Sequence, residues 1–186
     1  LATENLLVVH NNKAQTASFD PTTRKLTLPV IETQSESVYN LFIGHEVGHA
    51  LQTPVDWKDT VIAGTPFDFI NVIEDVRIEK YIQDKFPGLR KDFTRGYNEL
   101  NDKDFFDIAG KDLTKFSLID RLNLHFKLGS LAMVPFSEEE QMWVQAIDEC
   151  DTYQKVCLTA KMLSDWLNEK QEDEKEETEK YEPETD

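Results

Sequence analysis

Residues 45–49 have the sequence His45-Glu46-Val47-Gly48-His49, inside a segment whose apolar positions recur with a helical period. Ser35 or Ser37 can cap this helix, which is expected to end near Thr53-Pro54. Two histidines four positions apart lie about 40° apart around a helix axis and one turn apart along it. Both imidazoles can therefore reach one metal ion. Two solvated histidines on an ordinary helix are the weaker interpretation.

Glu46 and Gly48 occupy neighbouring faces of the same helix. Glu46 lies roughly 100° around the axis from His45, so its carboxylate is expected beside a bound metal rather than on it. A carboxylate in that place can take a proton from water and return it to a leaving amine. Gly48 allows another stretch of backbone to pack close. The pentapeptide therefore predicts a zinc ion (Zn²⁺) with a general base next to it.

A catalytic zinc site needs a third protein ligand. The extended pattern His-Glu-x-x-His-x-x-Gly-x-x-His is absent, since position 55 is Val, and His10 and His125 lie outside the neighbouring helix. That next helix is expected to start at Thr65-Pro66 and to reach Lys85. One of its faces carries Asn71, Glu74, Asp75 and Ile78. Glu74 is the predicted third ligand, with Asp75 or Glu79 as alternatives.

Several further side chains have candidate supporting roles. Asp75 can orient a ligand histidine, and Arg77 can pair with a carboxylate. Tyr97, Arg77 or His125 could stabilise a developing oxyanion. The competing interpretations are solvated charges on a helix surface for the acids and Arg77, and packing in a helical core for Tyr97 and His125.

The N-terminal part of the chain predicts a small antiparallel sheet. Residues 6–9 and 16–19 are candidate strands, residues 20–23 have the composition of a turn, and residues 25–31 alternate in polarity. Pro29 cannot donate a ladder hydrogen bond, which indicates an edge strand. Helices are expected at 90–100, 115–127 and 138–170, the last with a break near 151–152. The predicted class is α+β, with the edge-strand hairpin preceding a mostly helical body.

Composition limits the classes of function. The 186 residues include 39% hydrophobic residues and 11 Phe, which favours a globular fold. The formal net charge is −16, of which −7 lies in residues 169–186. We therefore expect a domain at 1–168, followed by an acidic tail or linker that is disordered or a frayed helix end. An acidic surface disfavours nucleic acid, and no apolar run suits a membrane span.

Cysteine usage predicts a reducing compartment. Cys150 and Cys157 are seven residues apart in a helical stretch, about 10 Å along the axis, which is too far for a disulfide bond. They do not form a CxxC pattern, so a thiolate zinc site is not expected. No basic-then-apolar leader is present at the start of the chain. A cytoplasmic setting is the expectation, in the host cytoplasm if the chain is encoded by a phage.

Two segments together resemble the gluzincin pattern of two histidines and a glutamate. The first is residues 45–50, and the second, some twenty-five residues later, is Asn71-x-x-Glu74-Asp75-x-Arg77-x-Glu79. More narrowly, residues 16–100 are similar to the metallopeptidase-like N-terminal regions of phage and bacterial proteins that carry a von Willebrand factor A domain further on. Those regions are often described as cobaltochelatase-subunit-like. One departure is Ile78, where many gluzincins have an orienting aspartate.

The resemblance implies a zincin-like fold in which the strand before the active helix binds an extended peptide by strand addition. Here that strand would contain Lys25, Leu26, Thr27 and Leu28. It also implies a C-terminal von Willebrand factor A module and an AAA+ ring ATPase of the chelatase or MoxR type as partners.

Three functions are compatible with these features. The first is a zinc endopeptidase with His45, His49 and Glu74 as ligands and Glu46 as the general base, acting on a peptide or protein substrate. The second is a catalytically silent interaction module that retains the fold and couples an ATPase to a client. The third, which is weaker, is a zinc hydrolase acting on a non-peptide amide. The intact Glu46 favours the first.

Overall fold

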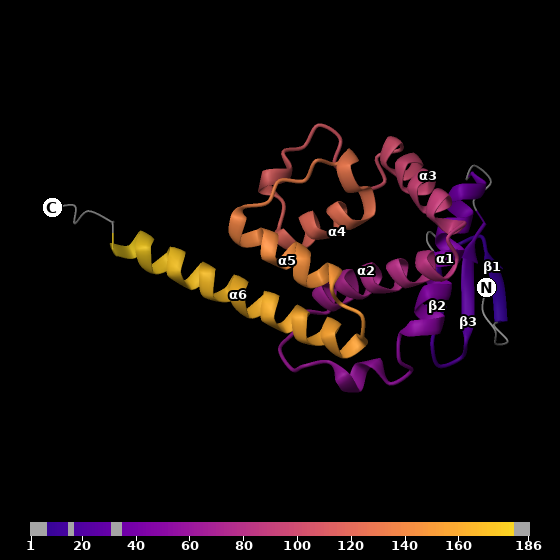
Figure 1. Cartoon of the computed structure of the whole chain (residues 1–186), viewed down its shortest axis with the longest axis horizontal. Helices are drawn as coiled ribbons and strands as arrows, with labels where there is room; N and C mark the ends of the chain where they lie inside the picture. Colours follow the sequence, from indigo (N-terminus) through magenta and orange to yellow (C-terminus); the bar gives the residue numbers. More distant parts are fainter. Residues whose placement is uncertain (1–6, 15–16, 31–34, 181–186) are drawn as a thin grey trace.

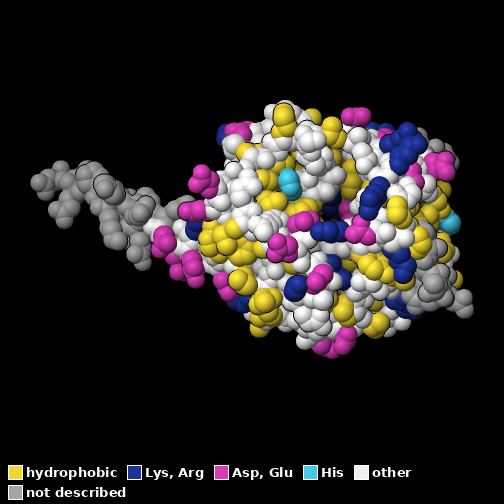
Figure 2. Space-filling view, viewed as in Figure 1, with side chains coloured by type: hydrophobic (Ala, Val, Ile, Leu, Met, Phe, Trp, Pro, Cys, Tyr) yellow, Lys and Arg dark blue, Asp and Glu magenta, His cyan; other side chains and the backbone are white. Residues whose placement is uncertain are grey.

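The computed structural model describes residues 7–14, 17–30 and 35–180. Within these residues a three-stranded sheet precedes six α-helices, which confirms the predicted α+β class (Figure 1). The ends of three predicted strands, at residues 6, 16 and 31, lie outside the described residues, as does part of the predicted tail at 181–186. On the face shown in Figure 2, acidic and basic side chains are interspersed among apolar ones.

The sheet contains β1 (Leu7–Asn11), β2 (Ser18–Asp20) and β3 (Lys25–Pro29), in the order β1-β3-β2. Strand β2 pairs with β3 in the antiparallel sense across the predicted turn, in which the Asp20 carboxylate accepts hydrogen bonds from the backbone of the two threonines that follow Pro21. Strand β1 pairs with β3 in the parallel sense. The expected hairpin is therefore present, but the sheet is mixed rather than antiparallel.

The prediction that residues 25–31 form an edge strand is wrong, because β3 lies between the other two strands. Pro29 is tolerated there as the last residue of β3, and the neighbouring Val30 N–H bonds to the Asn11 carbonyl instead. Within the described residues the strand edges belong to β1 and β2. Of these, β2 lies against the helix that carries the two histidines.

That helix, α1 (Glu36–Gln52), is capped by the Ser35 hydroxyl as predicted. A 3-10 turn, η1 (Trp57–Thr60), leads to α2 (Phe67–Lys85), where Pro66 rather than Thr65 occupies the capping position. Next come α3 (Leu89–Asp102), a 3-10 turn η2 (Leu113–Lys115), α4 (Leu118–Leu128) and a 3-10 turn η3 (Gly129–Leu131). These bounds agree closely with the helices expected from the sequence.

The C-terminal region is two helices, as expected from the break near 151–152. Helix α5 (Glu138–Asp148) begins with a capping box between Ser137 and Glu140. Helix α6 (Tyr153–Lys180) continues through much of the predicted acidic tail and projects from the body (Figure 1). Cys150 and Cys157 are buried and free. No helix within the described residues combines the length and the apolar character that crossing a membrane requires.

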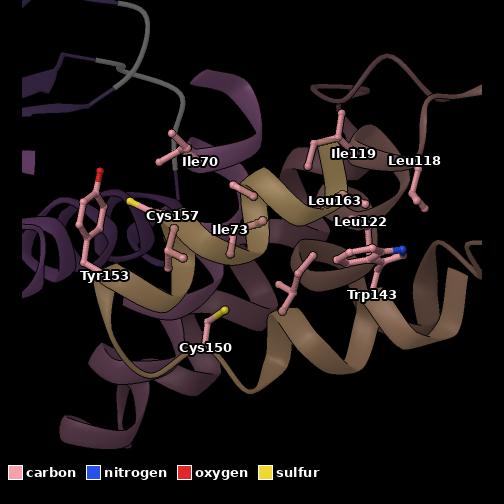
Figure 3. Close-up of a cluster of buried hydrophobic side chains, with 13 residues drawn as sticks. Ile70, Ile73, Leu118, Ile119, Leu122, Trp143, Cys150, Tyr153, Cys157 and Leu163 are labelled. Atoms are coloured by element: carbon pink, nitrogen blue, oxygen red, sulfur yellow. The ribbon is translucent and has the colours of Figure 1, made fainter. Parts of the chain in front are cut away.

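Helix α2 is the central element of the body. Ile70 and Ile73 belong to one buried cluster with side chains of α4, α5 and α6 (Figure 3). Ile82, three turns along, belongs to a second cluster formed with α1, α3 and α4. Because α2 is packed on several sides, its charged residues Glu74, Asp75, Arg77 and Glu79 are buried as well. A buried charge requires a partner, so each of these four side chains is expected to be paired with a neighbouring group.

At Gly48, α1 packs closely against α2. A Cβ atom there would lie 2.9 Å from Ile78 Cδ1 and 3.1 Å from the Ile78 carbonyl oxygen, so the predicted close packing at Gly48 is confirmed.

Gly48→Val should lower the free energy of unfolding by about 1–3 kcal/mol, measured by urea denaturation, because the helices must separate. Gly88→Val is the control, since a Cβ there meets no atom within 4 Å. Equal effects of the two substitutions would contradict the account.

Candidate metal centre

The His45 imidazole lies across one turn of α2. Its Nδ1 is 2.8 Å from Glu79 Oε1, and its Nε2 is 3.6 Å from Asp75 Oδ1. Asp75 and Glu79 are four residues apart, so their carboxylates extend from the same face of α2 about 6 Å apart along its axis. That separation suits the two nitrogens of one imidazole ring. Tyr97 Oη also donates a hydrogen bond to Glu79 Oε1, at 2.5 Å, and this bond holds the Glu79 carboxylate in place.

His49 is held by a chain of hydrogen bonds that reaches α2. Its Nδ1 lies 2.9 Å from Thr53 Oγ1, and the Thr53 hydroxyl donates to Glu74 Oε1 at 2.5 Å. Arg77 donates two hydrogen bonds to Glu74, from Nε at 2.8 Å and from its terminal nitrogen at 2.7 Å. The Glu74 carboxylate is thus occupied by Arg77 and Thr53. It supports His49 indirectly rather than facing the two histidines.

Asp75 is the carboxylate that both histidines share. Its Oδ1 lies 3.3 Å from His49 Nε2 and also faces His45 Nε2, while Lys127 Nζ donates to its Oδ2 at 3.0 Å. Burial disfavours the ionised form of Asp75, but His45 and Lys127 together lower its pKa below the usual value. Burial disfavours the Lys127 ammonium as well, yet Asp75 and Glu79 raise its pKa. Asp75 therefore stays an anion with one oxygen free for the histidines.

Glu46 lies on α1 between the two histidines in sequence and is 8% exposed. Burial raises the pKa of its carboxyl, and the neighbouring histidines only partly offset this effect. A carboxylate with a raised pKa is a stronger base than one in water. Glu46 is therefore suited to accept a proton in the space beside the histidines.

This donor set fits a divalent metal ion. Ligand atoms of His45, His49 and Asp75 all lie within 4.8 Å of one another. In each histidine, Nδ1 is within hydrogen-bond distance of an oxygen, that of Glu79 for His45 and that of Thr53 for His49. The Nε2 atom of each neutral imidazole is therefore left to face Asp75. Such outer partners are typical of metal-ligating histidines. Two imidazoles and one carboxylate are a common set of three protein ligands for a metal that keeps an open position.

A cavity of about 320 Å³ opens onto this cluster. His45, Glu46, His49 and Asp75 line one part of it, and residues 17–19 of the β2 segment line its rim. The remaining lining residues come from the turn after β2, the end of α1, η1, the first half of α2 and the start of α6, namely Pro21, Thr53, Trp57, Phe67, Ile70, Asn71, Glu74 and Tyr153. The cluster is thus accessible from the cavity, next to β2, which pairs on one side only in the described sheet.

Three of the predicted site residues lie outside the cavity lining. Among the described residues that line the cavity, Tyr97, Arg77 and His125 are absent. Tyr97 donates a hydrogen bond to Glu79, and burial and that carboxylate raise the pKa of Tyr97 well above the usual value. His125 packs between the rings of Phe126 and Phe136, and burial lowers its pKa. None of the three is placed to contact a ligand in the cavity.

Thr53 and Lys127 are two site residues that the sequence analysis missed. Thr53 was identifiable, because it is four residues after His49 and therefore on the same face of α1. Lys127 had no comparable signal. It is at the end of α4, 52 residues after Asp75, and only the packing of α4 on α2 brings them together.

Comparisons with profiles of known protein families, with curated proteins and with solved structures found no match. The assignment of a function therefore depends on the residues and geometry described above.

The ion pair of Arg77 with Glu74 gives a test of the network around His49. Arg77→Met leaves a buried carboxylate without its counter-charge and should cost about 3–5 kcal/mol in urea denaturation of the metal-free chain. Arg77→Met combined with Glu74→Leu should recover most of the loss. The control is Arg90→Met, which removes an exposed pair with Asp84 and should cost about 1 kcal/mol or less. Similar costs for the two single variants would contradict this role.

The metal-free protein should lose stability as the pH rises. Burial disfavours protonation of His45, but Asp75 and Glu79 raise its pKa to about 9. This folded-state pKa is above the roughly 6.5 of an unfolded histidine. The protonated ring therefore stabilises the fold fully below about pH 6.5, and this contribution is lost as the pH rises through 9. In the presence of EDTA, the free energy of unfolding should fall between pH 6.5 and 9.

His45→Gln should remove most of this slope, whereas His10→Gln, at an exposed histidine that bonds Tyr39, should retain it. A full slope in His45→Gln would show that another group titrates.

Proposed function

We propose that this chain is a zincin-like, zinc-dependent endopeptidase. The observation that carries the proposal is the convergence of His45, His49 and Asp75, with Glu46 beside them, at the base of a cavity bordered by a strand edge. In this proposal Asp75 replaces Glu74 as the third ligand, because Arg77 and Thr53 already occupy the Glu74 carboxylate. Asn71, with its amide donors in the cavity wall, is the candidate for polarising a bound carbonyl.

Zinc at this centre would supply Lewis-acid activation of water and of the peptide carbonyl. Glu46 would take a proton from the attacking water and pass it to the leaving amine, a role favoured by its place in the cavity lining beside the two histidines. Glu79 and Thr53 hold the histidine rings in place through their Nδ1 atoms. Lys127 holds Asp75 through its second oxygen, so that its first oxygen stays directed at the histidines.

The strand edge that would bind a peptide is β2 rather than β3. Strand β3, with Lys25, Leu26, Thr27 and Leu28, is paired on both sides and has no edge for strand addition. Residues 17–19 instead border the cavity, and β2 pairs only with β3 in the described sheet. An extended substrate added alongside β2 would pass over Glu46 and the histidines.

The alternative is an interaction module working with an AAA+ ATPase of the MoxR or chelatase type and with a von Willebrand factor A module. The observation that favours it is the projecting half of α6, where Glu169, Glu172 and Asp173 are exposed (Figure 1). Such an acidic helix suits contact with a basic partner surface. A cytoplasmic setting, consistent with two free buried cysteines, is part of both proposals.

Glu46→Gln separates the two proposals. With zinc-supplied protein and fluorescently labelled casein as substrate, the variant should lose about 10²–10⁴-fold in kcat while its zinc content per chain stays unchanged. Glu36→Gln is the control, because Glu36 is an exposed acid in the first turn of the same helix. Absence of turnover by the native chain, or turnover unaffected by Glu46→Gln, would favour the interaction module.

A further inference from the structure

The cavity has an apolar end that the chemistry proposed above does not use. Trp57, Phe67, Ile70 and Tyr153 line this end, and we call these four residues the apolar wall. The ring centroids of Trp57 and Phe67 are 5.4 Å apart, with the rings tilted. Both ends belong to one continuous cavity, so a ligand bound at the histidines can extend a side chain to the apolar wall.

The apolar wall is anchored in the core. Ile70 and Tyr153 are almost fully buried and belong to the hydrophobic cluster of α2, α4, α5 and α6. Figure 3 shows them at one end of this cluster, away from Trp143 and Leu118. The Tyr153 hydroxyl donates to the Trp57 carbonyl at 3.4 Å, which ties the start of α6 to η1. The shape of this part of the cavity is therefore largely fixed before a ligand binds.

The charges around the apolar wall indicate which side chains it accepts. Its four residues are uncharged, and the adjacent Asn71 is neutral. Apart from Glu46 and the metal cluster, Glu74 also lines the cavity, and its carboxylate is already paired with Arg77. A lysine or arginine side chain at the apolar wall would find this carboxylate occupied, and an acidic side chain would meet no lysine or arginine among the described lining residues. Burial of either charge would be unfavourable.

One residue of the apolar wall is also exposed to solvent. Phe67 lines the cavity, yet 58% of its surface is exposed. Large apolar side chains exposed next to a cavity are typical of a surface that binds an apolar ligand. An aromatic ring bound against Phe67 and the buried residues Ile70 and Tyr153 would remove part of this apolar surface from water.

We propose that the apolar wall is a subsite for one large, neutral, preferably aromatic side chain of a peptide, at a residue next to the bond that faces Glu46. This inference rests on the proposed peptidase function and adds the substrate class. The volume of about 320 Å³ is at the lower end of the roughly 300–1,000 Å³ typical of ligand pockets. The whole cavity, with the metal cluster included, therefore has room for about one side chain and its local backbone.

The test is binding of capped pentapeptides, acetyl-Gly-Gly-X-Gly-Gly-amide, to the full chain carrying Glu46→Gln, with and without zinc. X is Phe, Leu, Ala, Lys or Glu, and calorimetry gives each Kd. The Phe peptide should bind roughly ten- to a hundredfold tighter than the Ala peptide, with Leu between them. The Lys and Glu peptides should bind no tighter than the Ala peptide.

Phe67→Ala should weaken the Phe peptide by about tenfold and leave the Ala peptide unchanged. Phe67 is exposed, so this variant keeps the core intact. Phe105→Ala is the control, because Phe105 is 52% exposed and does not line the cavity. Equal binding of the Phe and Ala peptides, or an equal loss for both in Phe67→Ala, would overturn the subsite.

Hydrolysis by the native chain separates this inference from the function on which it rests. A Phe preference in binding, with no cleavage of the same peptides by zinc-supplied native chain, supports the subsite and contradicts the peptidase. Cleavage without a preference for Phe supports the peptidase and overturns the subsite.

Discussion

The close packing of α1 against α2 at Gly48 is the contact on which the candidate centre depends. With a hydrogen atom in place of a side chain, Gly48 lets the backbone of α1 lie directly on Ile78. This approach brings the His45 ring between Asp75 and Glu79, and it brings Thr53 within reach of both His49 and Glu74. A bulkier residue at position 48 would increase the distances from His45 to Asp75 and Glu79 and from Thr53 to Glu74, because these contacts join α1 to α2.

The buried charges of α2 form a balanced set around this contact. Asp75 is paired with Lys127, Glu74 with Arg77, and Glu79 accepts from Tyr97 and His45. Well-packed apolar side chains would often stabilise a fold as much as buried ion pairs of this kind. A group of buried ionisable side chains in and around the wall of one cavity is typical of a functional site, where burial and neighbouring charges shift pKa values for a chemical task.

Local patterns predicted most elements of the fold and the two histidines of the centre. Ser35 and the stop after Lys85 gave helix ends within a few residues, because capping and helix termination depend on near neighbours. The sheet was predicted less well, since the parallel pairing of β1 with β3 joins segments with no local signal for each other. To choose among Glu74, Asp75 and Glu79, one must know how α2 is rotated about its own axis. The packing of α2 on α4, α5 and α6 determines this rotation. The Arg77 partner of Glu74, three residues away, was the one local clue to that choice.

The most direct test of the account is the structure of the zinc-supplied chain, determined with anomalous scattering recorded at the zinc absorption edge. The account predicts one anomalous peak per chain, between His45 Nε2, His49 Nε2 and the Asp75 carboxylate, with Glu74 still bonded to Arg77 and Thr53. A peak at Glu74 with Arg77 displaced would contradict the ligand set. The absence of a peak at the two histidines, with zinc in excess, would contradict the metal centre itself.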